Sequence, residues 1–174
     1  MPLHPPTAGA ARELLVALGA APRLLRHVEL VGEAAELLLQ KLARLGVDAE
    51  LVRVGVVLHD AGKTLHPVEL DKPGGDHEPS GEALLLEHGA SPEVARICLS
   101  HALWQEMSVT LEELLVALAD KLWKGVRKPE LEERVIDLVA SRIGKSRWDL
   151  FVDLDSSFEH IAAGGTARLE RSRE

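Results

Sequence analysis

Apolar residues recur at intervals of three and four positions along most of this chain, which is the pattern of amphipathic helices. After a proline-rich start, residues 8–19 are predicted to form a first helix that ends at Gly19. Pro22 begins a long helix that ends at Gly46, because proline is favoured in the first turn of a helix and glycine just past its end. His27 lies beside the apolar stripe of this helix, which comprises Leu24, Val28, Val31, Ala35, Leu38 and Leu42.

The next segment, residues 51–58, is apolar and rich in β-branched side chains. Such a run suits a buried strand or a helix, and periodicity alone does not separate the two. We expect a helix, because no other segment alternates or concentrates β-branched residues and a lone strand would have no partner. Asp48 is the expected N-cap. His59 and Asp60 then fall at the helix end, where adjacent side chains can converge on one ion.

The second half of the chain begins with a predicted loop over residues 64–78, where proline and glycine are frequent and apolar side chains are few. Ser91-Pro92 is a helix-start signal, and Thr110 with Glu113 forms a capping box. The residues that follow the last helix are expected to be a mobile polar tail. Helices are predicted over residues 79–88, from 91 to about 101, and over 110–126, 129–143 and 147–163.

These elements predict an all-α fold, a helical bundle in a single domain. A chain of 174 residues is long enough to bury a substantial core. We expect an N-terminal segment with a short helix over residues 1–21, the helical domain over residues 22–163 and the polar C-terminal tail over residues 164–174.

Composition narrows the classes of function. Hydrophobic residues make up 46% of the chain and charged residues 28%, as in soluble globular proteins. The net charge of −8 argues against a broad basic face for duplex nucleic acid. No apolar run is long enough to span a membrane, and the run at residues 14–21 follows a charged pair rather than the basic start of a signal peptide. With Cys98 as its single cysteine, a cytoplasmic protein is expected.

Six side chains beside apolar segments can bind a divalent metal ion. Neutral imidazole and ionised carboxylate are both good ligands, and mixed sets suit manganese, iron, nickel and similar ions. Taken singly, each residue has an ordinary explanation, such as a core histidine or an ion pair between Asp120 and Lys124 on one helix face. Burying all of them near one core would be costly unless an ion satisfied them. The six are His27, His59, Asp60, His77, His101 and Asp120.

The sequence around these residues resembles the HD-domain metal-dependent phosphohydrolases. That family has a first histidine in a helix, an adjacent His-Asp pair and a distant aspartate, which would be His27, His59-Asp60 and Asp120. The local context also matches, because Lys63 completes a His-Asp-x-x-Lys sequence and Asp120 lies in Ala-Asp-Lys. The resemblance covers most of the expected helical domain and implies an HD-type helical bundle for it.

Members of this family with two metal ions carry two further histidines between the His-Asp pair and the last aspartate, and His77 and His101 stand in those places. The order of these residues along the chain, namely His, His-Asp, His, His and Asp, resembles that in the bacterial branch that cleaves dinucleoside polyphosphates symmetrically. The chain departs from that branch in the glycine-rich, acidic loop before His77 and in Ala102-Leu103-Trp104 after His101, so the substrate stays open. Trp104 is either a base-stacking residue or a core or lid tryptophan.

The resemblance implies a division of roles. Asp60 is expected to bridge two metal ions that activate water and hold the phosphate. Lys63 is expected to meet phosphate charge, so Asp60 and Lys63 are the candidate catalytic residues. Arg26, Lys124 and Arg127 are candidate outer phosphate contacts, and an ordinary solvated basic patch explains them as well. The other ligands would divide into His27, His59 and Asp120 for one ion and His77 and His101 for the second.

We therefore expect a phosphohydrolase that uses metal-activated water to cleave a phosphoester or phosphoanhydride of a nucleotide or similar small phosphorylated metabolite. Its cofactor is expected to be one or two divalent ions of iron, manganese, cobalt, nickel or magnesium. Two alternatives stay open, namely a di-iron oxygenase on the same fold and a non-catalytic nucleotide-binding bundle. The leucine-rich helices are compatible with internal packing or with a homodimer, and no membrane partner is expected.

Overall fold

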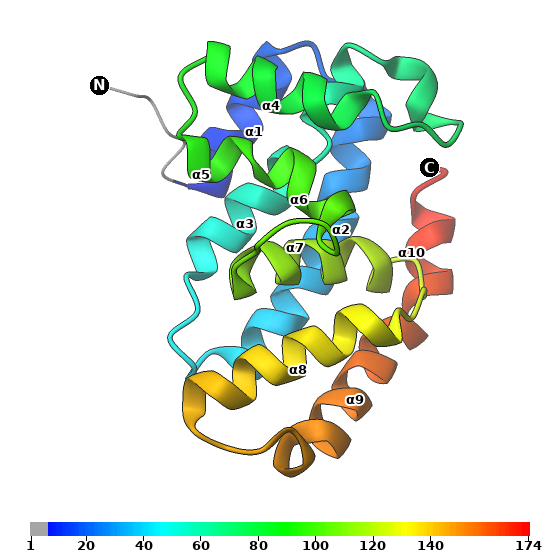
Figure 1. Ribbon diagram of the computed structural model, residues 1–174. Helices are drawn as coiled ribbons and strands as arrows, with labels where there is room; N and C mark the ends of the chain where they lie inside the picture. The colour runs from blue at the N-terminus through cyan, green and yellow to red at the C-terminus, as the bar shows by residue number, and fades with distance from the viewer. Residues whose placement is uncertain (1–6) are drawn as a thin grey trace.

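The computed structural model describes residues 7–174, which contain helices and connecting turns but no strand (Figure 1). The chain is therefore all-α, as its sequence predicts. The helices are α1 (Ala8–Ala17), α2 (Pro22–Leu42), α3 (Ala49–Leu58), α4 (His77–Glu87), α5 (Pro92–Ala95), α6 (Ile97–Leu103), α7 (Leu111–Leu122), α8 (Pro129–Ile143), α9 (Arg147–Ala163) and α10 (Gly165–Arg171), with the short 3-10 helices η1 (Ala61–Thr64) and η2 (Pro67–Leu70).

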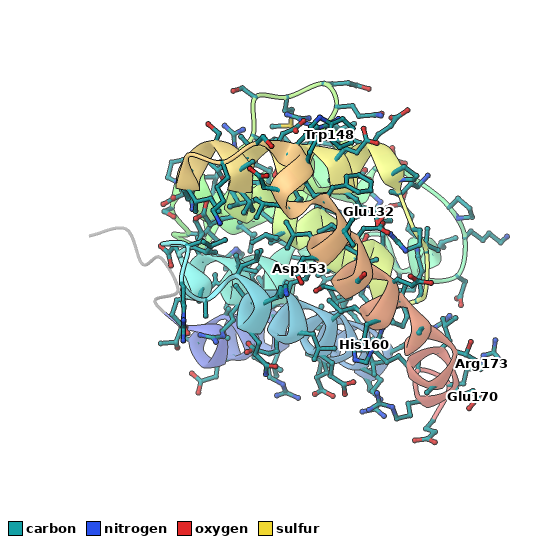
Figure 2. All side chains as sticks on the ribbon, turned by 90° about the horizontal axis from the view of Figure 1, so that it is seen from below. Glu132, Trp148, Asp153, His160, Glu170 and Arg173 are labelled. Atoms are coloured by element: carbon teal, nitrogen blue, oxygen red, sulfur yellow. The ribbon has the colours of Figure 1, made fainter. Side chains whose placement is uncertain are left out.

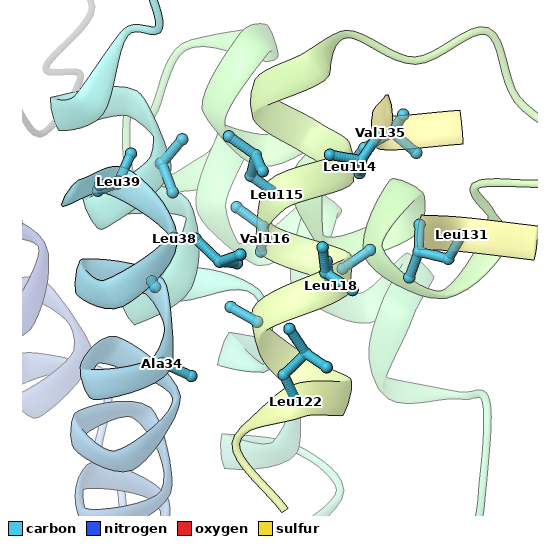
Figure 3. Close-up of a cluster of buried hydrophobic side chains, with 14 of the residues drawn as sticks. Ala34, Leu38, Leu39, Leu114, Leu115, Val116, Leu118, Leu122, Leu131 and Val135 are labelled. Atoms are coloured by element: carbon cyan, nitrogen blue, oxygen red, sulfur yellow. The ribbon is translucent and has the colours of Figure 1, made fainter. Parts of the chain in front are cut away.

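Helix α7 lies at the centre of the bundle, in contact with α2, α3, α6 and α8 (Figure 1). All of its residues except Lys121 are buried. Its start is the predicted capping box, in which Thr110 and Glu113 each accept a hydrogen bond from the backbone N–H of the other. Figure 3 shows Leu38 of α2 and Leu131 of α8 on opposite sides of α7. A helix this deeply buried can carry a charged side chain only where partners surround it.

Helix α3 lies between two apolar clusters, which explains its strand-like composition. Val52 and Val56 belong to the larger cluster, which includes residues of α2, α7 and α8. Val54 and Leu58 belong to a second cluster with residues of α1, α4 and α5. Because both faces of α3 are covered, its apolar residues need not keep to one stripe. The choice of helix over strand is confirmed, and the two residues that follow α3 are also buried.

The connection between α4 and α7 differs from the prediction. The helix expected from Ser91 is divided into α5 and α6 at Arg96, although Ser91 does cap its start. Arg96 donates hydrogen bonds to the Glu113 carboxylate and to the carbonyl oxygen of Ser108, which ties the break to the start of α7. Within residues 7–174, no helix combines the length and apolar character needed to cross a membrane.

The C-terminal residues form helix α10, so the predicted mobile tail is wrong. Arg168 on α10 is buried, and its guanidinium donates to three backbone carbonyl oxygens at the ends of α7 and α9. Gly165 also passes so close to Gly125 that a side chain there would collide with backbone. The sequence pattern missed this helix because an arginine, rather than an apolar stripe, makes its main buried contact. The three acceptors are the carbonyl oxygens of Leu122, Trp123 and Ile161.

Candidate metal centre

The six predicted ligands lie together inside the bundle, although they come from widely separated elements. Helices α2, α4, α6 and α7 each supply one residue, and the end of α3 supplies two. Five of the six are buried and one is partly buried. They are His27 on α2, His59 and Asp60 after α3, His77 at the start of α4, His101 on α6 and Asp120 on α7.

One half of this centre surrounds the Oδ2 atom of Asp60. This oxygen lies 3.1 Å from Nε2 of His27 and 3.5 Å from Nε2 of His59. Oδ1 of Asp120 lies 3.7 Å and 3.4 Å from the same two nitrogens. The ligand atoms of His27, His59 and Asp120 all lie within 4.8 Å of one another, which is close enough for one ion to bind the three.

The other half surrounds Oδ1 of Asp60. This oxygen lies 3.1 Å from Nε2 of His77 and 3.5 Å from Nε2 of His101. Glu78, which the sequence analysis did not single out, places Oε1 3.7 Å from Nε2 of His77 and forms a group of potential ligands with the two histidines, while His59, Asp60 and His101 form another between the halves. Asp60 therefore directs one carboxylate oxygen toward each half of the centre.

The hydrogen bonds of the imidazole nitrogens indicate whether the residues of this centre fit a metal ion. Nε2 of His27, His59 and His77 are all buried without a hydrogen-bond partner. Nδ1 of His59 lies 2.6 Å from the carbonyl oxygen of Val56, and Nδ1 of His101 lies 3.0 Å from the carbonyl one turn before it. Because a carbonyl only accepts, both Nδ1 atoms carry the hydrogen, and in the neutral ring the lone pair is on Nε2. A divalent ion would satisfy these nitrogens at once, so the donor set fits one.

The charges in the centre favour an ionised Asp60. Burial alone would raise the pKa of Asp60, but the histidines around it, His59 foremost, hold this pKa well below its ordinary value. Burial would likewise lower the pKa of His59, yet the carboxylates of Asp60 and Asp120 raise it. A bound cation would replace the protons that these imidazoles otherwise take up.

Glu69 is a functional candidate that the sequence analysis missed. Its Oε2 atom accepts a hydrogen bond from Nδ1 of His77 at 2.5 Å and another from the His77 backbone N–H at 3.0 Å. The backbone N–H of Asp76 donates to the other carboxylate oxygen. A carboxylate behind a ligating imidazole fixes the ring and raises its basicity. A single glutamate in a short 3-10 helix such as η2 gives no periodic signal, so only the fold brings it to His77.

Two glycines allow the halves of the centre to approach each other. A side chain at Gly62 on η1 would collide with the carbonyl oxygen of His77. A Cβ atom at Gly81 on α4 would lie 2.9 Å from the backbone nitrogen of Gly62. The segment that follows Asp60 can therefore pack directly on the start of α4 only because both positions lack side chains.

Only some of the predicted phosphate contacts lie near the centre. Nζ of Lys63 lies 2.8 Å from Oδ2 of Asp60, at the edge of the centre. Lys63 and Arg26 both line a cavity beside His27. Arg127, in contrast, donates to the carboxylates of Glu132 and Asp155, so its guanidinium is engaged by α8 and α9.

Two further predicted residues lie outside this cavity. Lys124 is partly buried and does not contribute to the cavity wall beside His27. Trp104 is buried in the larger apolar cluster, with the guanidinium of Arg134 over its ring at 5.8 Å. This position favours the core reading of Trp104 over base stacking.

The sequence of this chain is similar to the sequences of several known proteins. The chain is 35% identical over 101 residues to Ribonuclease Y of Thermosipho melanesiensis, a match that covers 56% of this chain and 19% of the relative. It is 36% identical over 111 residues to Ribonuclease Y of Pseudothermotoga lettingae, covering 62% and 21%. It is also 33% identical over 116 residues to the uncharacterized protein MJ0778 of Methanocaldococcus jannaschii, covering 58% and 64%. The chain thus spans about a fifth of the Ribonuclease Y relatives.

The fold also has a solved counterpart. The HD domain of phosphodiesterase PgpH from L. monocytogenes matches with a TM-score of 0.53 and 18% identity, covering 94% of this chain and 99% of that one. At this identity the likeness concerns the fold. The family model of the HD domain matches residues 24–125, more than half of the chain and a range that includes all six residues of the centre. The chain therefore belongs to the HD domain family of metal-dependent phosphohydrolases.

Proposed function

We propose that this chain hydrolyses a phosphoester or phosphoanhydride bond of a nucleotide or similar small phosphorylated metabolite at the centre around Asp60. The observation that carries the proposal is the position of Asp60, whose two carboxylate oxygens lie near two different sets of histidine nitrogens. A single ion would need only one of these sets. The arrangement therefore favours two divalent ions with Asp60 between them.

Divalent ions at this centre would supply an activated water and hold the oxygens of the phosphate. The chain's own residues would orient the imidazole rings and offset the charge of the phosphate. The hydrogens on Nδ1 of His59 and His101 keep both rings in the orientation that presents Nε2. Lys63 carries a positive charge between Asp60 and the cavity, where it would offset the charge of a phosphate oxygen. Four histidines among six ligands favour manganese, iron, cobalt or nickel over magnesium, which prefers oxygen ligands.

RNA is the second candidate substrate, because several relatives are named Ribonuclease Y. The chain spans only about a fifth of those proteins, and its net charge of −8 does not favour a long phosphate backbone. The two candidates differ in size, since a nucleotide is a small molecule whereas an RNA chain would have to extend beyond the cavity beside His27.

The test begins with elemental analysis of the protein purified without chelator. Hydrolysis is then assayed on nucleoside mono- and polyphosphates, dinucleoside polyphosphates and a 5′-labelled oligoribonucleotide, each with manganese, iron, cobalt, nickel or magnesium. We expect metal-dependent release of phosphate or nucleotide from the small substrates. Preferential cleavage of the oligoribonucleotide would favour RNA instead.

Variants separate the centre from the rest of the surface. Asp60→Ala is expected to lose bound metal and hydrolysis while its circular dichroism stays helical. Asp153→Ala, which removes an exposed carboxylate on α9, is the matched control and is expected to keep both (Figure 2). Full hydrolysis by Asp60→Ala would end the proposal. The same assay is repeated without dioxygen. Activity that persists there excludes the oxygenase alternative, because hydrolysis does not consume dioxygen.

A further inference from the structure

A cavity of about 890 Å³ opens beside His27, between the start of α2 and the C-terminal helix α10. Four cationic side chains and a single carboxylate, Glu174, line it. This excess of positive charge stands against a net charge of −8 for the whole chain. A local reversal of sign around a cavity indicates an anionic ligand. The four cations are Arg23, Arg26, Lys63 and Arg173.

The start of α2 supports the same conclusion. The positive end of a helix dipole favours acidic residues, but the first turn of α2 has none and its N-cap Ala21 makes no side-chain hydrogen bond. Arg23 and Arg26 occupy this position instead, where their charges oppose the dipole. An arrangement that costs stability in the isolated protein is expected where a bound anion offsets the cost.

The ion pairs that Arg23 and Arg26 make are partly or largely exposed. Arg23 pairs with Asp71, and both side chains are more than half exposed. Arg26 lies 3.7 Å from Glu29 and 3.8 Å from Glu174, whose side chain is 73% exposed. Exposed pairs at such distances contribute little to stability, so a phosphate can displace these carboxylates at small cost.

The walls of the cavity come from opposite ends of the chain. Arg173 is contributed by the segment just after α10, which Figure 2 shows far from Trp148 at the other end of the bundle. The indole N–H of Trp123, another residue of the wall, is buried without a hydrogen-bond partner. Trp123 is thus a wall residue with a buried donor that the protein itself leaves unpaired.

We propose that this cavity is a subsite for a second phosphate group of the substrate, held by Arg23, Arg26 and Arg173 while the scissile phosphate lies at the metal centre. The inference rests on the proposed function and narrows it to substrates with two or more phosphates. The second phosphate belongs either to a polyphosphate chain or to the neighbouring position of a dinucleotide. Both present the same charged oxygens to the arginines.

Kinetic comparison tests the subsite. AMP serves as the substrate with one phosphate, and ADP and the 5′-phosphorylated dinucleotide pApA serve as substrates with two. The wild-type protein is expected to have a higher kcat/KM for at least one of the last two, which identifies the source of the second phosphate. Arg26→Gln and Arg173→Gln are each expected to lower the ratio of that kcat/KM to the AMP value by roughly tenfold.

Arg44→Gln is the matched control, because Arg44 is exposed beyond the other end of α2. Its ratio is expected to equal the wild-type ratio. Arg26 also donates to the carbonyl oxygen of Arg171, so thermal unfolding is recorded for each variant, and Arg173→Gln gives a second measure without that contact. An unchanged ratio in both arginine variants would overturn the subsite even if metal-dependent hydrolysis persists.

Binding gives a readout that does not depend on turnover. Calorimetric titration compares methylenediphosphonate with methylphosphonate, neither of which contains a bond that a phosphohydrolase cleaves. The wild-type protein is expected to prefer the diphosphonate, and both variants to lose most of that preference. If the protein hydrolyses nothing but this preference is present and arginine-dependent, the subsite stands and the proposed function fails. Equal affinity of the wild-type protein for the two probes would refute the subsite.

Discussion

The carboxylate of Glu69 accepts a hydrogen bond from Nδ1 of His77 at 2.5 Å, while Nε2 on the other side of the same ring lies 3.1 Å from Asp60. One imidazole thus connects a carboxylate on η2 to the centre of the bundle. The contact keeps the hydrogen on Nδ1 and leaves Nε2 available as a ligand. Glu69 also accepts hydrogen bonds from the backbone N–H groups of Asp76 and His77, which hold η2 against the start of α4.

Replacing Glu69 by Gln should weaken metal binding in the half of the centre that contains His77. The amide keeps the shape of the side chain but loses the charge that makes the imidazole more basic, so we expect affinity for an ion held by His77 to fall roughly 10- to 100-fold. Metal titration followed by elemental analysis measures this loss. Glu87→Gln on the exposed side of α4 is the control, and equal metal content in both variants would contradict the positioning role.

Removing metal should lower the free energy of unfolding. An ion that binds the folded chain and not the unfolded one stabilises it by about 2.7 kcal/mol when free metal is at 100 times its dissociation constant. A chelator should therefore lower the midpoint of thermal unfolding, and restored metal should return it. The same midpoint with and without chelator, in protein shown to contain metal, would contradict metal ligation at this centre.

Metal affinity should depend on pH. Ligating imidazoles must be neutral, so protons compete with the ion. Burial opposes the protonated form of His77, but Asp60 and Glu69 outweigh it and raise its pKa, and Asp60 and Asp120 raise the pKa of His59. Competition therefore extends above the ordinary histidine value of about 6.5. We expect affinity to increase with pH through and beyond that value, as measured by competition with a fluorescent chelator. Affinity that is constant between mildly acidic and mildly alkaline pH would contradict imidazole ligation.

Arg168→Ala should destabilise the chain and open the wall of the cavity. The change leaves three buried carbonyl acceptors without their charged donor, which costs about 3 kcal/mol or more. Urea unfolding measures the loss, with Arg44→Ala as the exposed control. Hydrogen exchange should also accelerate in α10 before the rest of the bundle. Stability within error of the control would show that α10 is not anchored by this side chain.

Most of the helices could be predicted because each has local signals. Helix α8 begins at Pro129 and ends before Gly144, and α9 has the predicted bounds. The capping box at Thr110 marks the start of α7. These signals depend only on neighbouring residues, so the sequence contains them in full. Helix α10 has no such stripe, because its anchor is the single buried Arg168.

Some residues of the candidate site could likewise be predicted from the sequence, and others could not. The six predicted ligands could be gathered from their order in the chain, given the resemblance to a known family, and the fold does bring them together. Glu69 and the cavity could not be predicted, because they depend on how η2 and the C-terminal helix α10 pack against distant elements. Arg23 and Arg173 are 150 positions apart and line one cavity, and no local pattern relates them. The phosphate contact expected at Arg127 stays a prediction, and in the fold this side chain donates to two carboxylates that the sequence pattern does not relate to it.

The contact between Gly62 and Gly81 has a consequence for the stoichiometry of the centre. The two glycines set the distance between His77 and Asp60, because without side chains their backbones come into direct contact. A single methyl group at either position would work as a wedge and push α4 outward, leaving the half that contains His27 in place. If the centre binds two ions, one added carbon is expected to remove the ion next to His77 alone, which makes these glycines a means of asking what a second ion contributes.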